Sequence, residues 1–543
     1  MPILIPQIKG ELSDSRDEII EKAVRSAGIK QSDVSSADIY KISVDARKHD
    51  KNGIHFVYSV MVSLKDKSRE QFEADRNKLT YSPDASFFPD MMKKVRRVND
   101  KEKRSGRIVI AGFGPAGMFC ALVLAENGYE PIVVERGSAV DERVKKVSAF
   151  WNGGELDENT NVQFGEGGAG TFSDGKLTTR IKDPLCRYVL ERLVGFGAPE
   201  EILSRAKPHI GTDKLTGIVK SLRERIIEFG GEVHFDTRLD GITVSDGRVK
   251  SVRCVDKSGD IMDIECSCLV AAIGHSARDT AEMLIRSGVV IEQKPFAVGV
   301  RIEHKQSAVD ESLYGKYAGD ERLPKGEYQM SYTQKDGQSC YTFCMCPGGV
   351  VVPAASESGG VVVNGMSEFA RSGENANSAL VTAVNASSFG SGILDGMEFA
   401  RKIERRAFVA TGGYFAPATS VKGFLDGRPS LDCSVSPTYA RGVKAADFEK
   451  IFPANVTDML KKGLSVFAKR MKCFGDGGAL LTAPETRTSS PIRIVRGERL
   501  NAVGIENLYP CGEGAGYAGG ITSSAVDGIK TAISIAESFG AIE

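Results

Sequence analysis

Short apolar runs, each followed by a longer apolar or amphipathic stretch, recur along this chain and predict an α/β protein. Four apolar residues, 108–111, have the length and composition of a buried strand. An apolar helix follows to about Asn127, and Gly128 stands where glycine commonly follows a helix end. A second strand over 131–134 ends in Glu135, so the segment predicts a strand–helix–strand unit.

The turn between this strand and this helix carries Gly112, Gly114 and Gly117, a G-x-G-x-x-G pattern. The first glycine allows a tight turn, the second lets backbone approach a pyrophosphate, and the third lets the helix pack on the strand. Pro115 sets φ for the first helical residue, and the helix N-terminus presents free N–H groups to phosphates. Glu135 lies 18 residues past Gly117, where a carboxylate can bind ribose hydroxyls. Together these features predict a dinucleotide-binding unit.

Three further segments favour FAD over NAD as the dinucleotide. Residues 164–176 hold five glycines, which lets backbone lie against a bulky planar ligand or its phosphates. Residues 230–277 predict a strand, a hairpin with a Ser-Asp-Gly turn and a buried strand that ends at Gly274. Residues 506–521 predict a strand, a glycine-rich loop and a helix start, whose dipole can stabilise negative charge on a reduced flavin. NAD usually needs one contiguous domain, whereas the longer FAD gathers contacts from distant segments, so we expect FAD.

Several stretches of this chain resemble the bacterial FAD-dependent dehydrogenase (NAD(FAD)-utilizing dehydrogenase) family, within the glutathione-reductase-type FAD/NAD(P)-binding superfamily. Together the matches cover most of residues 40–543, and they are NVQFGEGGAGTFSDGKL (161–177), AAIGHSARDT (271–280), KPFAVGVRIEH (294–304), YTFCMCPGGVVVPAASE (341–357), VVVNGMSEFAR (361–371) and ETRTSSPIRI (485–494). The resemblance implies FAD contacts at Gly112, Gly114, Gly117, Glu135, Arg136, Val233, Gly274, Gly512 and Glu513. Most relatives in the wider superfamily carry Asp where this chain has Glu513. The resemblance supplies no substrate.

The same segments add further candidate contacts with FAD. The glycine-rich loop and the two helix starts, near 115 and near 521, would bring backbone close to the cofactor. The additional candidates are Pro115, Ala116, Gly167, Gly168, Ala169, Gly520 and Ile521.

The spacing of these elements predicts a discontinuous Rossmann-like FAD-binding domain, an inserted strand-rich α+β capping domain and a small N-terminal α+β domain. Residues 1–104 predict a βαββ domain and a polar linker that begins at about residue 65, and 105–292 predict the first part of the FAD-binding domain. Residues 293–480 predict the insertion, which would cap the flavin and supply the substrate pocket. Residues 481–543 would complete the FAD-binding domain. Within the insertion, residues 376–386 are predicted as a helix.

Composition and charge narrow the class of protein. Lys plus Arg and Asp plus Glu are 71 each, so the bulk charge gives no reason to expect a nucleic-acid partner. The N-terminal residues lack a signal-peptide pattern and no run of ~20 apolar residues occurs, so we expect a cytoplasmic protein without a membrane span.

The 11 cysteines are scattered, mostly in apolar segments, which favours buried free thiols. Cys344 and Cys346 are spaced C-x-C, which predicts two side chains on one strand face without the usual redox geometry, and we expect no metal there.

Four side chains outside the cofactor motif are candidates for the chemistry. His275 follows Gly274 and can be a general acid or base, or a hydrogen-bonded structural histidine. Glu485 and Arg487 precede the C-terminal FAD segment, and Arg487 can bind a substrate carboxylate through two hydrogen bonds. Alternatively, residues 485–493 can form a salt-bridged seam between domains. Lys176 closes the glycine-rich loop and can stabilise charge near flavin N1 or O2.

These observations predict an FAD-dependent oxidoreductase that transfers hydride between non-covalently bound FAD and a small organic substrate. The sequence has one Rossmann fingerprint, so NAD(P)H, if it is the electron donor, would bind transiently. Two alternatives stay open. One is an FAD-dependent monooxygenase, and the other is an FAD-binding RNA-modification or RNA-binding factor, suggested by residues 1–104 and their basic turn at 47–51.

Overall fold

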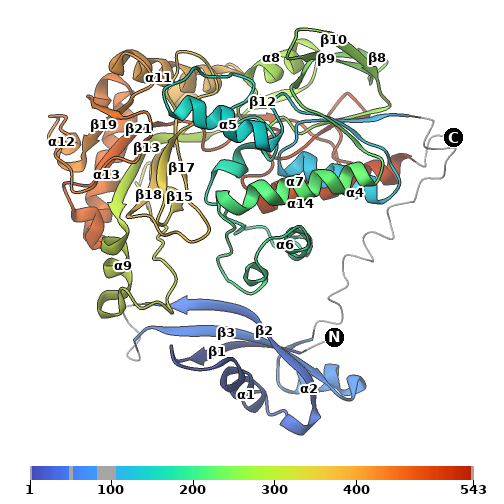
Figure 1. Ribbon diagram of the computed structural model, residues 1–543, viewed down its shortest axis with the longest axis vertical. Coiled ribbons are helices and arrows are strands. Elements are labelled where there is room, and N and C mark those ends of the chain that lie inside the picture. The colour runs from blue at the N-terminus through green and yellow to red at the C-terminus, as the bar shows by residue number, and fades with distance from the viewer. Residues whose placement is uncertain (1–2, 48–52, 82–105, 540–543) are drawn as a thin grey trace.

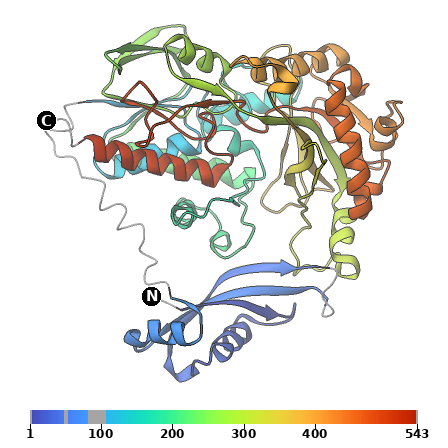
Figure 2. The same ribbon diagram turned by 180° about the vertical axis from the view of Figure 1, so that it is seen from behind.

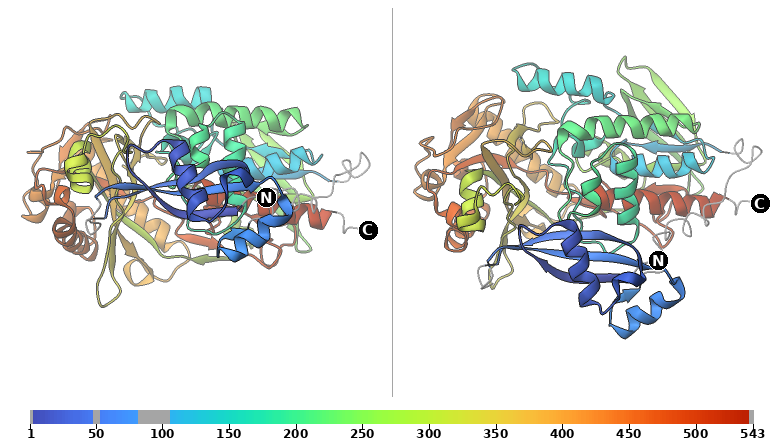
Figure 3. Two further views of the ribbon diagram at one scale, coloured as in Figure 1. Left: turned by 90° about the horizontal axis from the view of Figure 1, so that it is seen from below. Right: turned by 60° about the horizontal axis from the view of Figure 1, so that its bottom comes forward.

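The chain folds into three parts, which we define by residues. A computed structural model describes residues 3–47, 53–81 and 106–539. The parallel-sheet domain comprises residues 106–293 and 490–539, the inserted domain residues 294–489, and the N-terminal domain residues 3–81. The first two lie side by side, and the N-terminal domain, in blue, lies below them in both side views (Figures 1 and 2). Seen from below, the N-terminal domain lies across the other two (Figure 3).

Five parallel strands in the order β23-β11-β5-β6-β7 form the centre of the parallel-sheet domain. Their bounds are Ile108–Ala111 for β5, Ile132–Val134 for β6, Glu232–His234 for β7, Cys268–Ala271 for β11 and Leu508–Pro510 for β23. The strand–helix–strand unit predicted for 108–135 is confirmed. Because β23 comes from the C-terminal segment, the end of the chain completes a sheet that begins at residue 108.

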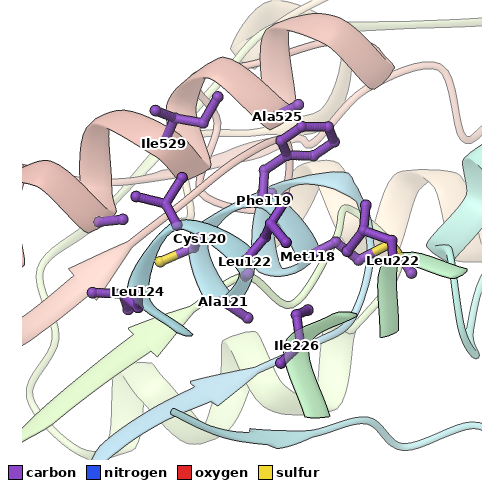
Figure 4. Close-up of a cluster of buried hydrophobic side chains, with 14 of the residues drawn as sticks. Met118, Phe119, Cys120, Ala121, Leu122, Leu124, Leu222, Ile226, Ala525 and Ile529 are labelled. Atoms are coloured by element: carbon purple, nitrogen blue, oxygen red, sulfur yellow. The ribbon is translucent and has the colours of Figure 1, made fainter. Parts of the chain in front are cut away.

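Helices cover one face of this sheet. Helix α4 (Pro115–Glu126) lies between α14 (Ile521–Phe539) and α7 (Thr212–Glu228), and Figure 4 shows its side chains packed against both. The packed side chains are Met118, Phe119, Cys120, Ala121, Leu122 and Leu124 of α4, Ala525 and Ile529 of α14, and Leu222 and Ile226 of α7. Each fully buried large apolar side chain contributes about 1.5–3 kcal/mol relative to an exposed one. This core therefore fixes the start of α4 relative to the sheet.

A second, antiparallel sheet covers the opposite face. It consists of β8 (Thr237–Ser245), β9 (Arg248–Asp256) and β10 (Ile261–Glu265). Val109 and Leu269 of the parallel strands point to this sheet, whereas their neighbours Ile110 and Val270 point to the helices. The strands are apolar throughout because both faces are buried.

The inserted domain is built on a seven-stranded sheet with the order β14-β15-β18-β13-β21-β19-β20. The strands span Phe296–Lys305 (β13), Ser331–Thr333 (β14), Ser339–Cys346 (β15), Asn375–Val384 (β18), Ala416–Ser420 (β19), Val443–Ala445 (β20) and Leu480–Glu485 (β21). Helices α11 (Asp395–Thr411) and α13 (Ala454–Arg470) supply side chains to its core. Because β21 lies between β13 and β19, the inserted sheet continues past residue 480 to Glu485.

Residues 375–384 form a strand, and the helix predicted for 376–386 is wrong. Strand β18 pairs with β13 on one side and β15 on the other, so it is central in the sheet. All but one of its residues are buried, and a strand buried on both faces has no alternating polar pattern. Its alanines favour a helix locally, but the hydrogen bonds to two neighbouring strands override that preference.

Short elements connect these layers (Figure 1). They are α5 (Val140–Trp151), α6 (Leu185–Gly195), α8 (Arg278–Arg286), α9 (Gln306–Tyr314), α10 (Ala386–Phe389), α12 (Val421–Leu425), β12 (Ile291–Gln293), β16 (Val350–Pro353), β17 (Val363–Met366) and β22 (Ile492–Ile494).

The N-terminal domain is a four-stranded sheet in the order β2-β3-β1-β4 with two helices. Its elements are β1 (Ile3–Gly10), α1 (Arg16–Ser26), β2 (Val34–Asp45), β3 (His55–Leu64), α2 (Glu70–Arg76) and β4 (Thr80–Tyr81). The predicted βαββ order is confirmed, and α2 and β4 occupy a stretch that was predicted to belong to the linker. Most of the predicted basic turn and linker, residues 48–52 and 82–105, lie outside the described residues.

A buried ion pair network joins the two larger domains. Glu404 of α11 is 1% exposed and accepts hydrogen bonds from both Arg278 of α8 (2.9 and 3.0 Å) and Arg487 (2.9 and 3.1 Å). Thr486 donates a further bond of 2.7 Å to the same carboxylate. Burial acts to raise the pKa of Glu404, but the two guanidinium groups outweigh it and hold that pKa well below its usual range.

Replacing Glu404 by alanine is expected to lower the free energy of unfolding by about 3–5 kcal/mol, because two buried arginines lose their partner. Urea unfolding of wild type and variant measures the change. Glu398→Ala is the matched control on the same helix; Glu398 is 43% exposed and bound to Arg401, so its loss should cost less than about 1 kcal/mol. Equal costs for the two variants would contradict this account.

The pH dependence of the same pair of variants gives a second readout. Because the folded pKa of Glu404 lies below an unfolded value of about 4.3, its contribution is complete at neutral pH and is lost only as the pH falls below about 4. The stability difference between wild type and Glu404→Ala should therefore shrink in acid.

Candidate functional site

The glycine turn after β5 is closed so tightly that no side chain fits at two of its positions. Gly112 has a φ of 103°, and a Cβ there would lie 2.9 Å from the carbonyl carbon of Ala272. A Cβ on Gly117 would overlap the carbonyl oxygen of Gly112. These two glycines therefore place the start of α4 directly against β5 and β11, as the motif predicts.

Three segments that are far apart in the sequence meet around this turn. A Cβ on Gly168 would lie 3.0 Å from the Cα of Gly114, and one on Gly514 would lie 2.6 Å from the amide nitrogen of Gly274. A Cβ on Gly512 would lie 2.7 Å from the Cβ of Ala116. The four glycine segments predicted from the sequence are thus brought together, and their glycines form a cradle that side chains would fill.

The remaining candidates from these segments lie in the same region. The amide of Gly167 donates to Phe113 at 2.9 Å, and Ala169 lies in the short 3₁₀ turn that starts at Gly168. Ile521 begins α14, one residue after Gly520, and lies 3.1 Å from a Cβ built on Gly170. Val233 lies in β7, the strand at the edge of the parallel sheet, where it pairs with Val133 of β6.

The N-terminus of α4 is suited to an anion. Gly114 is its N-cap and makes no side-chain hydrogen bond to the helix, and Pro115 occupies the first turn. Gly112, Gly114 and Pro115 are partly exposed, although the helix that follows is buried. Uncapped amides and the positive end of the helix dipole therefore face the cradle, which fits a pyrophosphate.

Glu135 has a structural role that the sequence did not reveal. Its carboxylate accepts hydrogen bonds from the amides of Phe113 (2.8 Å), Gly137 (3.0 Å) and Gly165 (2.9 Å), and the residue is 5% exposed. A carboxylate offers about four acceptor positions, so one remains for a ribose hydroxyl. The next residue, Arg136, bonds to Asp279 at 2.9 Å and contributes to the same edge.

Arg143, which sequence analysis missed, holds the glycine-rich loop in shape. Its guanidinium is fully buried and donates to the carbonyl oxygens of Asn161, Val162, Gly165 and Glu166 at 2.6–3.2 Å. Burial lowers its pKa to about 10, so it remains charged at neutral pH. In the sequence, Arg143 is one of three basic residues in an amphipathic helix, with Lys145 and Lys146, and that pattern normally indicates solvated side chains.

Glu513 lies in the loop before α14, with part of its surface still exposed. Burial raises its pKa to about 7, although the nearby Lys294 acts to lower it. Lys294 donates to the carbonyl oxygen of Gly516 at 3.0 Å, which holds its ammonium group beside this loop. Near neutral pH, Glu513 can therefore exist in both protonation states.

His275 lies next to this loop and is neutral at physiological pH. Its Nδ1 is 2.8 Å from the hydroxyl of Ser276. Burial, reinforced by the positive charges of Arg487 and Arg278, lowers its pKa to about 3. A cationic His275 is thereby excluded at neutral pH, and Nε2 is the ring nitrogen not engaged by Ser276.

The other three candidates are bound to partners that sequence analysis missed. Lys176 lies 3.0 Å from both Asp174 and Glu327. Glu485 binds the guanidinium of Arg301 through two hydrogen bonds of 2.8 and 3.2 Å. Arg487, which could have bound a substrate carboxylate, binds the carboxylate of Glu404 instead. The buried Nη1 of Arg487 has no hydrogen-bond partner among the described residues.

Within the described part of the chain, no helix combines the length and the apolar character that crossing a bilayer requires. Among those same residues, no group of three or more His, Cys, Asp or Glu side chains could hold a metal ion.

Comparisons with known proteins identify the family of this chain. Residues 295–488, which contain the inserted sheet through β21, match the family described as FAD-dependent protein, C-terminal domain-like. A flavin-dependent brominase variant covers 81% of this chain and 81% of its own, at 12% identity and a TM-score of 0.37. A geranylgeranyl bacteriochlorophyll reductase-like protein from Thermoplasma acidophilum covers 80% of this chain and 78% of its own, at 10% identity and a TM-score of 0.35. An uncharacterized protein from Clostridium beijerinckii is 45% identical over 544 residues and covers 99% of both chains. The chain therefore belongs to the same family as the clostridial protein, and its residues 295–488 carry the domain described as FAD-dependent protein, C-terminal domain-like.

Proposed function

We propose that this chain is an FAD-dependent oxidoreductase that transfers hydride between non-covalently bound FAD and a small organic substrate. The observation that supports this most is the mutual approach of four glycine segments, at Gly112–Gly117, Gly168, Gly274 and Gly512–Gly514. A single NAD-type turn needs no such convergence, whereas FAD is long enough to contact all four. The match of residues 295–488 to an FAD-dependent family supports the same cofactor.

The residues around the cradle fit the successive parts of FAD. The amides at the start of α4 would bind the pyrophosphate, and the free acceptor position of Glu135 would bind the adenosine ribose. Glu513 and the start of α14 would contact the ribityl chain and the ring. When bound there, FAD supplies the hydride transfer.

The four chemical candidates would then have different tasks. Lys176 is partly buried, which acts to lower its pKa, but Asp174 and Glu327 outweigh this and raise it, so it would hold a protonated hydrogen-bond donor near the ring. His275 would hydrogen-bond to substrate through Nε2 as a neutral ring. Glu485 and Arg487 are neutralised by Arg301 and Glu404, so we assign them the positioning of the 485–490 backbone.

The proposed reaction is tested with the full-length protein as purified. We expect flavin absorbance in the visible range and anaerobic bleaching by NADH, NADPH or one member of a metabolite panel. Slow reoxidation by oxygen after bleaching supports a dehydrogenase. Rapid substrate-dependent oxygen uptake would instead favour a monooxygenase. A colourless protein whose melting temperature does not respond to added FAD would refute the proposal.

Gly114→Ala is expected to weaken FAD binding by at least about tenfold, or about 1.4 kcal/mol, because a methyl group would stand where backbone meets the pyrophosphate. The fold should survive, since φ is −83° and the new Cβ would lie 3.7 Å from the Cα of Gly168, an ordinary contact. Titration of the FAD-depleted protein with FAD measures the dissociation constant.

Gly217→Ala is the matched control for that measurement. Gly217 is exposed inside α7, and a Cβ there meets nothing within 4 Å. Its FAD affinity should be unchanged and its stability equal or higher by about 0.5–1 kcal/mol. If both variants bind FAD equally well, the pyrophosphate does not lie at Gly114.

FAD affinity should fall as the pH rises through about 7. Glu513 is neutral below that pH and negative above it, and a negative carboxylate repels the anionic pyrophosphate and loses its hydrogen-bond donor. Glu513→Gln stays neutral, so its dissociation constant should vary several-fold less between pH 6 and pH 8. Parallel pH profiles of the two proteins would show that Glu513 does not titrate beside the cofactor.

A further inference from the structure

Two cysteines of β15 lie on an irregular stretch of strand. Phe343 pairs with Ala379 and Cys346 with Asn377, so β15 has one more residue than β18 between these pairs, which is a β-bulge. Cys344, inside the bulge, has a φ of 45°, a conformation that non-glycine residues rarely adopt. The regular strand that the C-x-C spacing predicts is therefore absent here. Bulges of this kind occur next to active sites, where they re-aim a side chain.

The bulge brings the backbone of Cys344 and the sulfur of Cys346 to one buried cation. The guanidinium of Arg301 is fully buried; its Nη1 donates to the carbonyl oxygen of Cys344 at 3.0 Å and lies 3.9 Å from the Sγ of Cys346. Cys346 is buried, whereas Cys344 is partly exposed. Asn377, opposite Cys346, is fully buried, and its Nδ2 has no hydrogen-bond partner among the described residues. A donor is thus available beside the pair.

The two thiols differ in acidity, because the pKa of Cys344 is lowered and that of Cys346 is raised. The Cys346 thiol hydrogen-bonds to the carbonyl oxygen of Cys344 at 3.5 Å. The neighbouring Cys346 side chain, followed by the charges of Arg301 and Lys176, lowers the pKa of Cys344 although burial opposes it. Nine of the eleven cysteines lie outside the pair, and burial raises the pKa of each of these, Cys433 included. A low-pKa, partly exposed thiol next to a second thiol is the arrangement of reactive cysteines.

The pair also lies beside the proposed cofactor cradle. The charges of Lys176, at the end of the glycine-rich loop, and of Glu513, before α14, both interact with Cys344. Those two residues come from two of the segments that would surround the ring.

We propose that Cys344 and Cys346 are a redox-active dithiol that exchanges electrons with the bound flavin, an inference that rests on the proposed function. In the oxidative direction the two S–H bonds break and one S–S bond forms. The pair passes two electrons and one proton to oxidised flavin, and the second proton goes to solvent. The reverse step regenerates the dithiol. Cys344 reacts first, as the thiolate, and Cys346 supplies the second sulfur of the disulfide.

Reductive titration of the purified holoprotein tests this pairing. The air-oxidised protein should take up about twice as many electrons per bound FAD as its Cys344→Ser and Cys346→Ser variants, because the disulfide accepts a second pair. Iodoacetamide labelling followed by peptide mass spectrometry gives an independent readout. The peptide that contains both cysteines should be unlabelled and lighter by two hydrogens before reduction, and doubly labelled after it.

Cys433→Ser is the matched control, since Cys433 is also a partly exposed cysteine of the inserted domain. It should take up as many electrons as wild type, and at pH 7 Cys344 of the reduced protein should be alkylated at least tenfold faster than Cys433. Flavin-containing wild type that takes up no more electrons than the serine variants, with both thiols labelled before reduction, would overturn this inference alone. Protein without flavin absorbance would overturn the proposed function and this inference with it.

Discussion

The carboxylate of Glu135 is the interaction on which the geometry of the cofactor cradle depends. Its three amide donors belong to the turn after β5, the end of β6 and the glycine-rich loop. A buried carboxylate is costly unless its oxygens are bonded, so the three segments are held in one arrangement. The side chain that the motif assigns to the ribose is therefore also the group that shapes the surrounding backbone.

Much of the nucleotide unit could be predicted from the sequence because its determinants are local. The positions of Gly112, Gly114 and Gly117 between two apolar strands follow from spacing alone. The partners of Glu485, Lys176 and Arg487 could not be predicted, since Arg301, Glu327 and Glu404 come from other strands and helices. The helix predicted for residues 376–386 was wrong for the same reason, because the conformation of β18 is set by its neighbours in the sheet.

Buried arginines recur at the borders between segments of this protein. Arg143 holds the glycine-rich loop, Arg301 joins β13 to β15 and β21, and Arg278 binds α11 from the parallel-sheet domain. A guanidinium has five donors in a fixed plane, so one buried side chain can fix several carbonyl or carboxylate oxygens. None of these arginines was a candidate for the chemistry in the sequence, yet together they fix the segments around the cradle and join the inserted domain to the parallel-sheet domain.

The N-terminal domain meets the rest of the chain through backbone. Ile42 of β2 accepts a hydrogen bond from the amide of Ala206 at 2.8 Å and donates to the carbonyl oxygen of Ser204 at 2.7 Å. Strand β2 is the outer strand of its sheet, and an outer strand left open is a template for pairing with other chains. The loop at 204–206 occupies part of that edge, so loosening it would expose the strand and favour self-association in place of the native fold.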